Sequence, residues 1–551
     1  MKVCADFETT TVVDDCRVWA WGICDIDTYE FEYGNTIEGF FEWCRKHAPV
    51  QIYFHNLKFD GEFILNWILR NGFTWTNNKK LETKEFSTII SDQNLFYNIN
   101  IRFAPRKMIK IYDSLKIIPM SIEAMAKAFD LPIEKEEITY TETREPGHIL
   151  TDQEVLYLHN DVEIPARALH LMFSQGLTKM TCASNALNDY KEIMGKQLFQ
   201  NYYPAPVYDA DIRQAYKGGF TYLNPKYKGK MVGKGIVLDF NSLYPSVMYY
   251  CDLPHHEGKF FQGQYQHDRI YPLYIQMLRC EFEIKPGHIP TIQLKNSLLF
   301  RPNEYVTSSH GEEITLCLTS VDLELFFEQY DVYNVEYLSG WKFRKGNNLF
   351  REYIDKWYGI KAQATLDGNK GMRTLAKLMQ NSLYGKFAKN PCMRSKMPYL
   401  DERGIVKYKE LPPNDVKPLY IPVAAFITAY GRAKTIRAAQ SCYDRYIYSD
   451  TDSIHLEGWE VPEGLEIDPV KLGALDLESK FTRGKFLRQK TYMEEIDGEV
   501  KITCAGMPAE CYKNVTFENF QEGATFSGKL MPKHCAGGIV LEETDFTIKF
   551  E

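Results

Sequence analysis

Two kinds of hydrophobic pattern alternate along the first 180 residues or so of the chain. Short apolar runs typical of buried strands are KVCADF, QIYFHN and IKIYDSL. Apolar residues spaced as on one face of a helix occur in GEFILNWILRNG and in the longer TDQEVLYLHNDVEIPARALHLMFSQG. Because strands alternate with helices, we expect an α/β layer fold in this part of the chain.

Glycines interrupt the chain in YKGGFTYLN, before the next apolar strand, KGIVLDF. These glycines indicate the boundary between two units, and we expect the second unit to begin near residue 190. Residues 349–386 have helical spacing, and the proline-rich stretch after them contains MPYLDERGIVKYKEL, which predicts a hairpin with Arg403 and Gly404 at its turn. From about residue 501 the pattern predicts short strands and loops.

The composition is that of a folded soluble protein, with 551 residues, 44% of them hydrophobic and 25% charged. A chain of this length should divide into several units. Its acidic start does not resemble a signal peptide, and no apolar run is long enough to span a membrane, so we expect a cytosolic protein with no membrane partner. The 13 cysteines include no C-x-x-C pair and should be reduced thiols.

The net charge of −8 argues mildly against a nucleic-acid-binding protein. However, an enzyme that holds divalent cations needs clustered carboxylates, and its polyanion track can still be locally positive. Basic residues gather at 102–110, 226–234 and 483–490. The charge therefore does not exclude a nucleic-acid substrate.

A first group of carboxylates lies in the N-terminal unit. Asp6 and Glu8 are two apart on a predicted strand, so they share one face, although a solvated edge strand would show the same pair. Asp60 follows the second apolar strand, and Asp161 lies four residues after Tyr157 on the long helix. Four such carboxylates could hold two divalent ions about 3.5–4 Å apart for the attack of water on a phosphodiester, with Tyr157 orienting the water.

A second group lies in the C-terminal unit. The strand in GKGIVLDFNSLYPSVMYY ends at Asp239, and a helix is expected to start at about Ser242, so that the amides of Ser242, Leu243 and Tyr244 could face a triphosphate. RYIYSDTDSIHLEG predicts a strand, tight turn and strand with Asp450 and Asp452 at the tip. A plain turn is the alternative, but apolar residues on both sides favour a cation site.

A polar face is expected on the helix in LAKLMQNSLYGKFA. Lys377, Asn381 and Tyr384 are spaced as on one face of one helix, and that face is too polar for a core.

These motifs, in this order, resemble those of family B DNA polymerases with a proofreading exonuclease. D-x-E, N-x-x-x-F-D and Y-x-x-x-D resemble the three exonuclease motifs, and DFNSLYP, KLMQNSLYG and YSDTDS resemble polymerase motifs A, B and C. The resemblance covers the whole chain. It is closest to the protein-primed polymerases of the phi-twenty-nine phage type, because the chain is short and has extra segments between motifs A and B and between B and C.

The resemblance implies roles for further residues of the first unit. Lys135 would lie near the scissile phosphate, although it could also be a solvated surface lysine. Core packing is the alternative for Tyr53 and Phe59. The residues implied to line the exonuclease cleft around the unpaired 3′ end are Thr9, Tyr53, His55, Asn56, Phe59, Ser114 and Leu115.

In the second unit the resemblance implies two metal ions held by Asp239 and Asp452, with Asp450 close by and the carbonyl of Phe240 in the shell. The metal would be Mg²⁺, two ions per active site, which Mn²⁺ could replace. Tyr244 would exclude a 2′-hydroxyl. The other implied contacts are Ser242, Leu243, Lys361, Lys377 and Asn381 for the nucleotide, Tyr384 for the nascent base pair, Tyr216, Gly218 and Gly219 for the DNA backbone, and Lys490 and Tyr492 for the primer.

The fold implied is α+β and multidomain, with an RNase H-like exonuclease domain at 1–182 and a right-hand polymerase domain. We expect a palm at 183–294, 347–352 and 421–500, a first insertion at 295–346, fingers at 353–388, a second insertion at 389–420 and a thumb at 501–551. The implied partners are template-primer DNA, deoxynucleoside triphosphates and a terminal protein that acts as primer. The chain should be a monomer in the host bacterial cytoplasm.

Two other interpretations remain open. One is a stand-alone DEDD exonuclease joined to a nucleic-acid-binding module, which would not need the spacing of Lys377 and Tyr384. The other is a reverse transcriptase, in which the two aspartates of the hairpin would be adjacent, whereas Thr451 separates them here.

Overall fold

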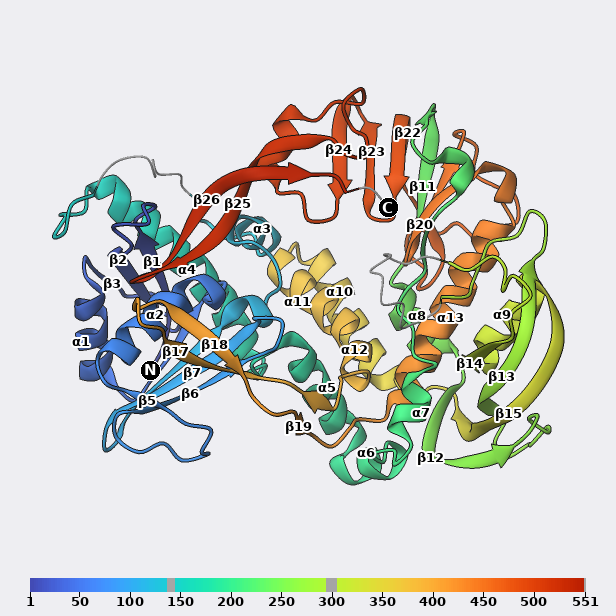
Figure 1. The fold of residues 1–551 in the computed structure, drawn as a ribbon, viewed down its shortest axis with the longest axis horizontal. Coiled ribbons are helices and arrows are strands. Elements are labelled where there is room, and N and C mark those ends of the chain that lie inside the picture. The colour runs from blue at the N-terminus through green and yellow to red at the C-terminus, as the bar shows by residue number, and fades with distance from the viewer. Residues whose placement is uncertain (136–143, 294–304, 550–551) are drawn as a thin grey trace.

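The computed structural model describes residues 1–135, 144–293 and 305–549. The N-terminal unit is built on an eight-stranded sheet of order β3-β2-β1-β4-β8-β7-β6-β5 (Figure 1). Strands β1, β4 and β8 run parallel to one another, which confirms the predicted α/β fold. The strands are β1 (Lys2–Thr9), β2 (Val18–Asp25), β3 (Phe31–Gly34), β4 (Val50–Phe54), β5 (Thr74–Trp75), β6 (Glu85–Ile90), β7 (Phe96–Ala104) and β8 (Lys107–Asp113).

Helices cover both faces of this sheet. Val3 and Ala5 of β1 pack in a core shared with α1 and α2, whereas Cys4 packs in a core shared with α4. Because side chains alternate along a strand, Asp6 and Glu8 face α4. The helices of this unit are α1 (Ile37–His47), α2 (Leu57–Arg70), α3 (Ile122–Ala128) and α4 (Asp152–Ser174). Three further helices follow in the chain and contact the second unit instead, α5 (Cys182–Met194), α6 (Lys196–Tyr202) and α7 (Asp209–Arg213).

The second unit is organised around a sheet of order β24-β23-β22-β11-β21-β20-β9, in which β10 also pairs with β22. Strand β11 lies between β21 and β22, and β20 and β21 form the predicted hairpin. Helices α8 (Leu243–Tyr250) and α13 (Ile421–Gln440) pack against each other, and α13 also contacts β20 and β21. The strands are β9 (Thr221–Leu223), β10 (Met231–Val232), β11 (Gly235–Phe240), β20 (Tyr446–Asp450), β21 (Ser453–Glu457), β22 (Leu475–Arg488), β23 (Thr491–Ile496) and β24 (Glu499–Cys504).

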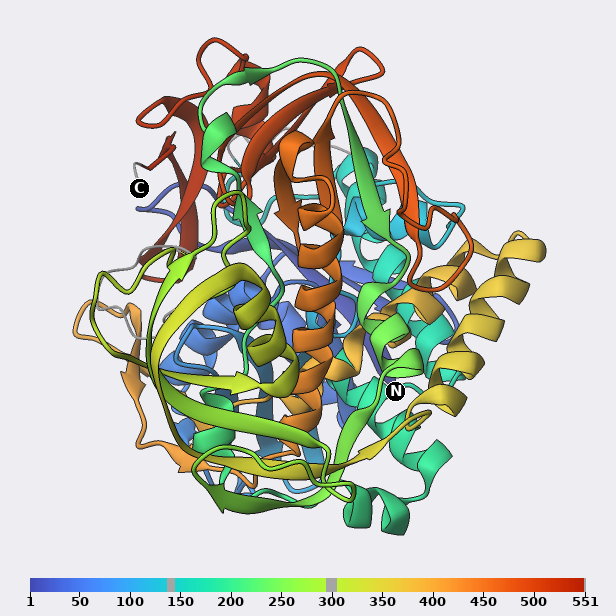
Figure 2. The same ribbon diagram turned by 90° about the vertical axis from the view of Figure 1, so that its right-hand side faces the viewer.

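A separate four-stranded sheet of order β12-β15-β13-β14 includes the first insertion. Strands β12 (Leu253–Gln262) and β13 (Leu273–Ile284), expected in the palm, pair along their length with β15 (Tyr330–Gly346), so this sheet begins well before residue 295. Strand β14 (Ile314–Thr319) pairs with β13, and α9 (Ser320–Gln329) packs between the sheet and α13 (Figure 2). Residues 295–304 of the predicted insertion lie outside the described residues.

The predicted helical fingers are two antiparallel helices, α10 (Arg351–Leu366) and α11 (Lys370–Ser382), followed by the short α12 (Tyr384–Phe387). Lys377 and Asn381 lie exposed on α11. Tyr384, predicted on the same helix, instead begins α12, because the helical ladder is interrupted at Leu383.

Two hairpins from the second unit reach back to the first (Figure 1). One is the predicted hairpin of the second insertion, β17 (Lys396–Leu400) and β18 (Val406–Glu410), whose turn includes Gly404 at φ 73°. It follows β16 (Cys392–Met393), which pairs with β19 (Asn414–Asp415). The other is β25 (Thr525–Cys535) with β26 (Gly538–Thr547), so the prediction of only short strands at the C-terminus was wrong.

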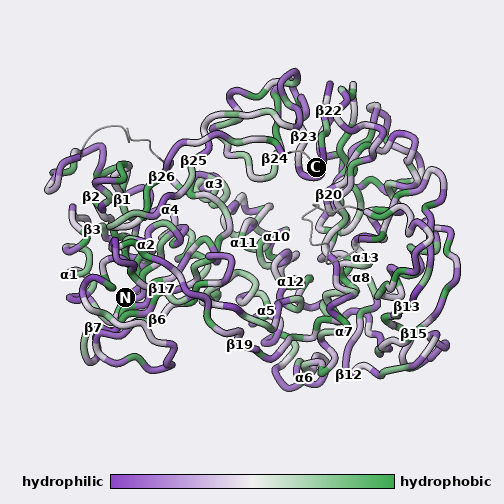
Figure 3. Tube along the Cα trace, viewed as in Figure 1, coloured by the Kyte–Doolittle hydropathy of each residue, from purple (hydrophilic) through white to green (hydrophobic). Residues whose placement is uncertain are grey.

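Both hairpins bury apolar side chains in the N-terminal unit. Val406 of β18 and Cys535, Ile539 and Val540 of the C-terminal hairpin belong to the core formed by β1, α1 and α2. Hydrophobic stretches lie along β1 and β2 and along α8 and α13, and hydrophilic ones along the outer loops (Figure 3). Within the described ranges, no helix is both long and apolar enough to cross a membrane.

Candidate active sites

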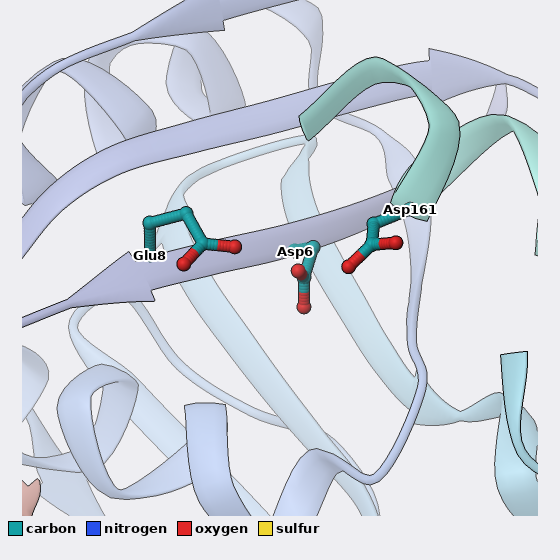
Figure 4. A group of neighbouring side chains, drawn as sticks. All are labelled: Asp6, Glu8 and Asp161. Atoms are coloured by element: carbon teal, nitrogen blue, oxygen red, sulfur yellow. The ribbon is translucent and has the colours of Figure 1, made fainter. Parts of the chain in front are cut away.

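The predicted exonuclease carboxylates meet between β1 and α4. Ligand atoms of Asp6, Glu8 and Asp161 all lie within 4.8 Å of one another (Figure 4). Asp60, in the first turn of α2, is 3% exposed, and its charge raises the pKa of both Asp6 and Glu8. All four predicted carboxylates therefore contribute to one electrostatic site.

Burial and mutual repulsion disfavour the charged forms of these carboxyl groups. Burial raises the pKa of Glu8 to about 8, and the charges of Asp161 and Asp60 add to the shift. The pKa of Asp60 is raised to about 8, mainly by burial, and that of Asp6 lies well above its usual range. One oxygen each of Asp60 and Asp161 is buried with no hydrogen-bond partner among the described residues. Oxygen ligands that are buried, clustered and unpaired fit a divalent cation.

Lys135 and Tyr157 lie beside these carboxylates. The ammonium of Lys135 is 3.1 Å from Oδ2 of Asp161 and 5.8 Å from the ring of Tyr157. Tyr157 is buried, and its hydrogen bond to Asp161 lowers the pKa of that carboxyl against the larger effect of burial. The ammonium of Lys135 and the phenol of Tyr157 therefore both lie beside the candidate metal site.

The residues predicted to line the exonuclease cleft separate into two groups. Thr9 and Phe59 are half-buried, and Asn56 is exposed at φ 73° as it begins α2. Leu115 borders a cleft of about 1370 Å³ that also reaches the second insertion. Tyr53, in contrast, is 5% exposed, with its ring centroid 5.4 Å from those of Tyr112 and Phe173. For Tyr53 the structure supports core packing.

His55 and Ser114 are engaged inside the fold. The Ser114 hydroxyl is fully buried and donates to the carbonyl of Phe54 at 3.0 Å, and Nδ1 of His55 lies 3.0 Å from that hydroxyl. Nε2 of His55 lies 2.8 Å from the carbonyl of Met120, and burial lowers the pKa of the ring. These contacts join the end of β4 to the segment after β8, so Ser114 supports the cleft and does not line it.

The sequence analysis missed Asp113 in the same region. It is 1% exposed and accepts hydrogen bonds from the backbone of Asn56 at 3.1 Å and Leu115 at 3.0 Å. Asp113 is the last residue of the apolar strand β8, and that position was the available signal.

The polymerase carboxylates come from β11 and the β20–β21 hairpin. Asp239 is aligned with Ser453 of β21 and Asp476 of β22, and the amide of Phe240 donates to the carbonyl of Asp452 at 2.9 Å. Burial, followed by the charges of Asp452 and Glu478, raises the pKa of Asp239 to about 7. Burial and the charges of Asp450 and Glu478 raise the pKa of Asp452 as well. Carboxyl groups that are partly buried and repel one another, as Asp239 and Asp452 do, fit a site for divalent cations, whose positive charge would offset theirs.

Asp450 has a different environment. Thr221 donates to its Oδ1 at 3.1 Å, and the ammonium of Lys490 lies 3.1 Å from its Oδ2. The sequence analysis missed Thr221, Glu478 and Asp476, because a single threonine or acidic residue on a strand carries no motif.

The predicted nucleotide contacts gather around α8 and α11. Ser242 begins α8 at φ 55°, and the Leu243 side chain is buried, so only its amide could meet a phosphate. The rings of Tyr244 and Tyr384 lie 4.2 Å apart. The charge of Lys377 partly offsets the rise in the pKa of Asp239. Burial, followed by the charges of Arg373 and Lys377, lowers the pKa of Lys361. Lysines and tyrosines thus lie near the carboxylates as a nucleotide site requires.

Comparison with known proteins decides the family. Residues 42–152 and 137–467 match the model of DNA polymerase type B, organellar and viral. A DNA polymerase of Bacillus phage Nf is 47% identical over 99% of each chain, and one of Streptococcus phage Cp-1 is 34% identical over 99% of this chain and 98% of its own. The chain belongs to the type B DNA polymerases. It is thus neither a stand-alone exonuclease nor a reverse transcriptase.

The solved structures agree with this family. The polymerase has a TM-score of 0.94 to phi29 DNA polymerase complexed with primer-template DNA and incoming nucleotide substrates, at 44% identity over 100% of both chains. This confirms a multidomain α+β polymerase of the phi29 phage type.

In this polymerase the YKGG segment packs on the β20–β21 hairpin. A side chain at Gly219 would come within 2.6 Å of the Thr451 hydroxyl and 3.0 Å of the Tyr244 hydroxyl, which explains the glycine. Gly218 is exposed and Tyr216 half-buried. Arg432, which the sequence analysis missed, donates to the carbonyls of Lys217 and Gly218, each at 2.8 Å.

Tyr492, a predicted primer contact, lies against the base of the same hairpin. Its ring centroid is 5.0 Å from that of Tyr448 and 5.4 Å from that of Phe486. The amide of Lys490 donates to the Tyr448 hydroxyl at 2.9 Å. Lys490 and Tyr492 are therefore both in contact with the hairpin that carries Asp450 and Asp452.

Proposed function

We propose that this DNA polymerase replicates a linear phage genome from a protein primer, with 3′–5′ proofreading, high processivity and strand displacement. The observation that carries the proposal is the presence of two separate carboxylate sites, one at Asp6, Glu8 and Asp161 and one at Asp239 and Asp452, each with residues suited to nucleic acid beside it. It would act in the cytoplasm of the bacterial host as a monomer.

At the polymerase site Asp239 and Asp452 would hold two Mg²⁺ ions, or Mn²⁺ in their place, with the carbonyl of Phe240. The ions would supply Lewis acidity at the primer hydroxyl and the leaving pyrophosphate. Lys377 and the amides at the start of α8 would position the triphosphate. Tyr244 and Tyr384, whose ring centroids lie 4.2 Å apart, would flank the sugar and the nascent base pair and so select deoxynucleotides.

At the exonuclease site Asp6, Glu8, Asp60 and Asp161 would hold the divalent ions that favour hydroxide at neutral pH. Tyr157 would orient the attacking water, and Lys135 would offset the charge that develops on the phosphate. The unpaired 3′ end would lie along Thr9, Asn56, Phe59 and Leu115, supported from below by His55 and Ser114.

The second insertion and the thumb would close a ring around the DNA. Support comes from their hairpins, which are both anchored in the core of the exonuclease unit. A ring that rarely opens would keep the enzyme on its template. An insertion hairpin across the template path would separate the strands ahead of synthesis. The first insertion, carried on the β12–β15 sheet, would receive the terminal protein, whose hydroxyl primes the first nucleotide.

A deletion tests strand displacement. Removing residues 392–417 should abolish synthesis through duplex DNA and spare extension on single-stranded templates, measured on a primed circle with and without a blocking strand. Degradation of a single-stranded oligonucleotide serves as the folding control, because the deleted hairpin packs on the exonuclease unit. Retained displacement would contradict the assignment.

A labelling reaction tests protein priming. Incubation with the terminal protein, Mg²⁺ and labelled deoxynucleotide should yield a covalent protein–nucleotide adduct. An enzyme that extends DNA primers but gives no adduct would refute protein priming and leave the polymerase assignment in place.

A further inference from the structure

Thr221 connects the YKGG segment to the catalytic hairpin through a partly buried hydrogen bond. The residue lies on β9, aligned with Asp450 of β20, and is 6% exposed. Its hydroxyl donates to Oδ1 of Asp450 at 3.1 Å. Thr451 adds a weaker donor at 3.3 Å to the same oxygen, and Lys490 lies 3.1 Å from the other. Each oxygen of Asp450 thus has a protein partner.

The two other aspartates of this site lack such support. Among the described residues, no side-chain hydrogen bond or ion pair is made to the carboxylates of Asp239 or Asp452, and burial raises the pKa of both. Their free oxygens suit direct metal ligation. Asp450 is instead held in one orientation before any substrate arrives.

Of the two partners, Thr221 has the fixed geometry. The Lys490 side chain is 54% exposed, belongs to a predicted primer contact, and can leave Asp450 when DNA binds. Thr221 cannot move away, because its backbone is paired with β20 and its side chain is enclosed. A short β-branched side chain on a paired strand has few alternative rotamers.

We infer that Thr221 is a positioning residue of the polymerase reaction, which fixes the Asp450 carboxylate beside the metal site and couples that orientation to the YKGG segment two residues earlier. The inference rests on the proposed role of Asp450 in that site. Without the Thr221 hydroxyl, the half-buried carboxylate of Asp450 loses one hydrogen bond and can rotate. The kcat for nucleotide incorporation should fall, while the binding of DNA and of nucleotide should persist.

Thr221→Val removes the hydroxyl and keeps the shape, and Thr221→Ser keeps the hydroxyl. In single-nucleotide incorporation with Mg²⁺ we expect the valine variant to lower kcat roughly 10- to 100-fold, with KM for the nucleotide and Kd for primer-template changed less than about 3-fold. The serine variant should recover most of kcat. Both should degrade single-stranded DNA at the wild-type rate, since the exonuclease site is separate.

The Asp450→Asn background separates the inference from the function on which it rests. There Thr221→Val should cause no further loss, because the two residues act as one unit. Equal loss in the valine and serine variants, or unchanged kcat in the valine variant, would overturn the role of Thr221. If Asp450→Asn itself incorporated nucleotides at the wild-type rate, the assignment of Asp450 to the site would fail instead.

Discussion

The hydroxyl of Tyr408 donates a 2.7 Å hydrogen bond to Glu62, which ties the hairpin of the second insertion to α2 of the exonuclease unit, 346 positions away in the chain. Glu62 is 2% exposed, and its other oxygen lies 3.4 Å from Nδ1 of His534 on the C-terminal hairpin. One buried carboxylate therefore joins three parts of the chain.

Tyr408→Phe should loosen this junction. Removing the donor leaves Glu62 buried without its hydrogen bond, which costs about 1–3 kcal/mol. We expect faster proteolysis of the insertion hairpin and shorter products on a primed circle in excess trap DNA. Tyr399→Phe is the matched control, since Tyr399 lies on the same hairpin and is 42% exposed. If both variants behave alike, the junction does not hold the hairpin in solution.

The exonuclease carboxylates make the stability of the metal-free protein depend on pH. Asp60 has an ordinary carboxyl pKa near 3.8 when unfolded and about 8 when folded, so the folded protein binds more protons between these values. Stability should therefore fall as pH rises from about 4 to 8 and stay low above 8.

Asp60→Asn removes this penalty. It should raise the melting temperature in EDTA at pH 8.5 and have little effect at pH 4, with each kcal/mol worth about 1 °C in a chain of 551 residues. Excess Mg²⁺ should reduce the difference at high pH, because the cation stabilises the charged wild-type site. A gain that is the same at both pH values would show that Asp60 is not held neutral by burial.

Tyr244→Val should admit ribonucleotides. The ring centroid of Tyr244 lies 4.2 Å from that of Tyr384. In the proposed mechanism this ring lies beside the sugar, where a smaller side chain would leave room for a 2′-hydroxyl. The ratio of kcat/KM for ribonucleotides to that for deoxynucleotides should rise by at least about 10-fold, or 1.4 kcal/mol. Tyr250→Val, on an exposed position of the same helix, should leave the ratio unchanged. An unchanged ratio in Tyr244→Val would remove it from sugar selection.

Lys135→Gln should slow degradation and not synthesis. Its ammonium lies 3.1 Å from Asp161, where it can offset charge on the reacting phosphate. We expect degradation of a single-stranded oligonucleotide to fall about 10- to 100-fold with primer extension intact. Lys127→Gln, at an exposed lysine 76% accessible on α3, provides the comparison. If the two substitutions had equal effects, Lys135 would act only as a surface charge and would have no specific role in degradation.

Local pattern was enough to predict much of the two sites. Alternation along a strand fixes which face Asp6 and Glu8 share, and a polar tip between two apolar strands fixes the hairpin of Asp450 and Asp452. These relationships span a few residues. They do not depend on how distant segments pack.

Relationships between distant segments could not be predicted in this way. The burial of Tyr53 and Ser114 depends on which elements cover the end of β4, and the pairing of Thr221 with Asp450 joins positions 229 apart. The register of β12 and β13 with β15 likewise depends on long-range pairing, which hydrophobic pattern alone leaves open.

The central claim is that one chain carries two independent carboxylate centres, one for synthesis and one for degradation. Primer extension and single-strand degradation with Mg²⁺ test it directly in Asp239→Ala and Asp6→Ala. We expect Asp239→Ala to lose synthesis and keep degradation, and Asp6→Ala to do the reverse. If either substitution abolished both activities in a folded protein, or if neither affected one of them, the account would be contradicted.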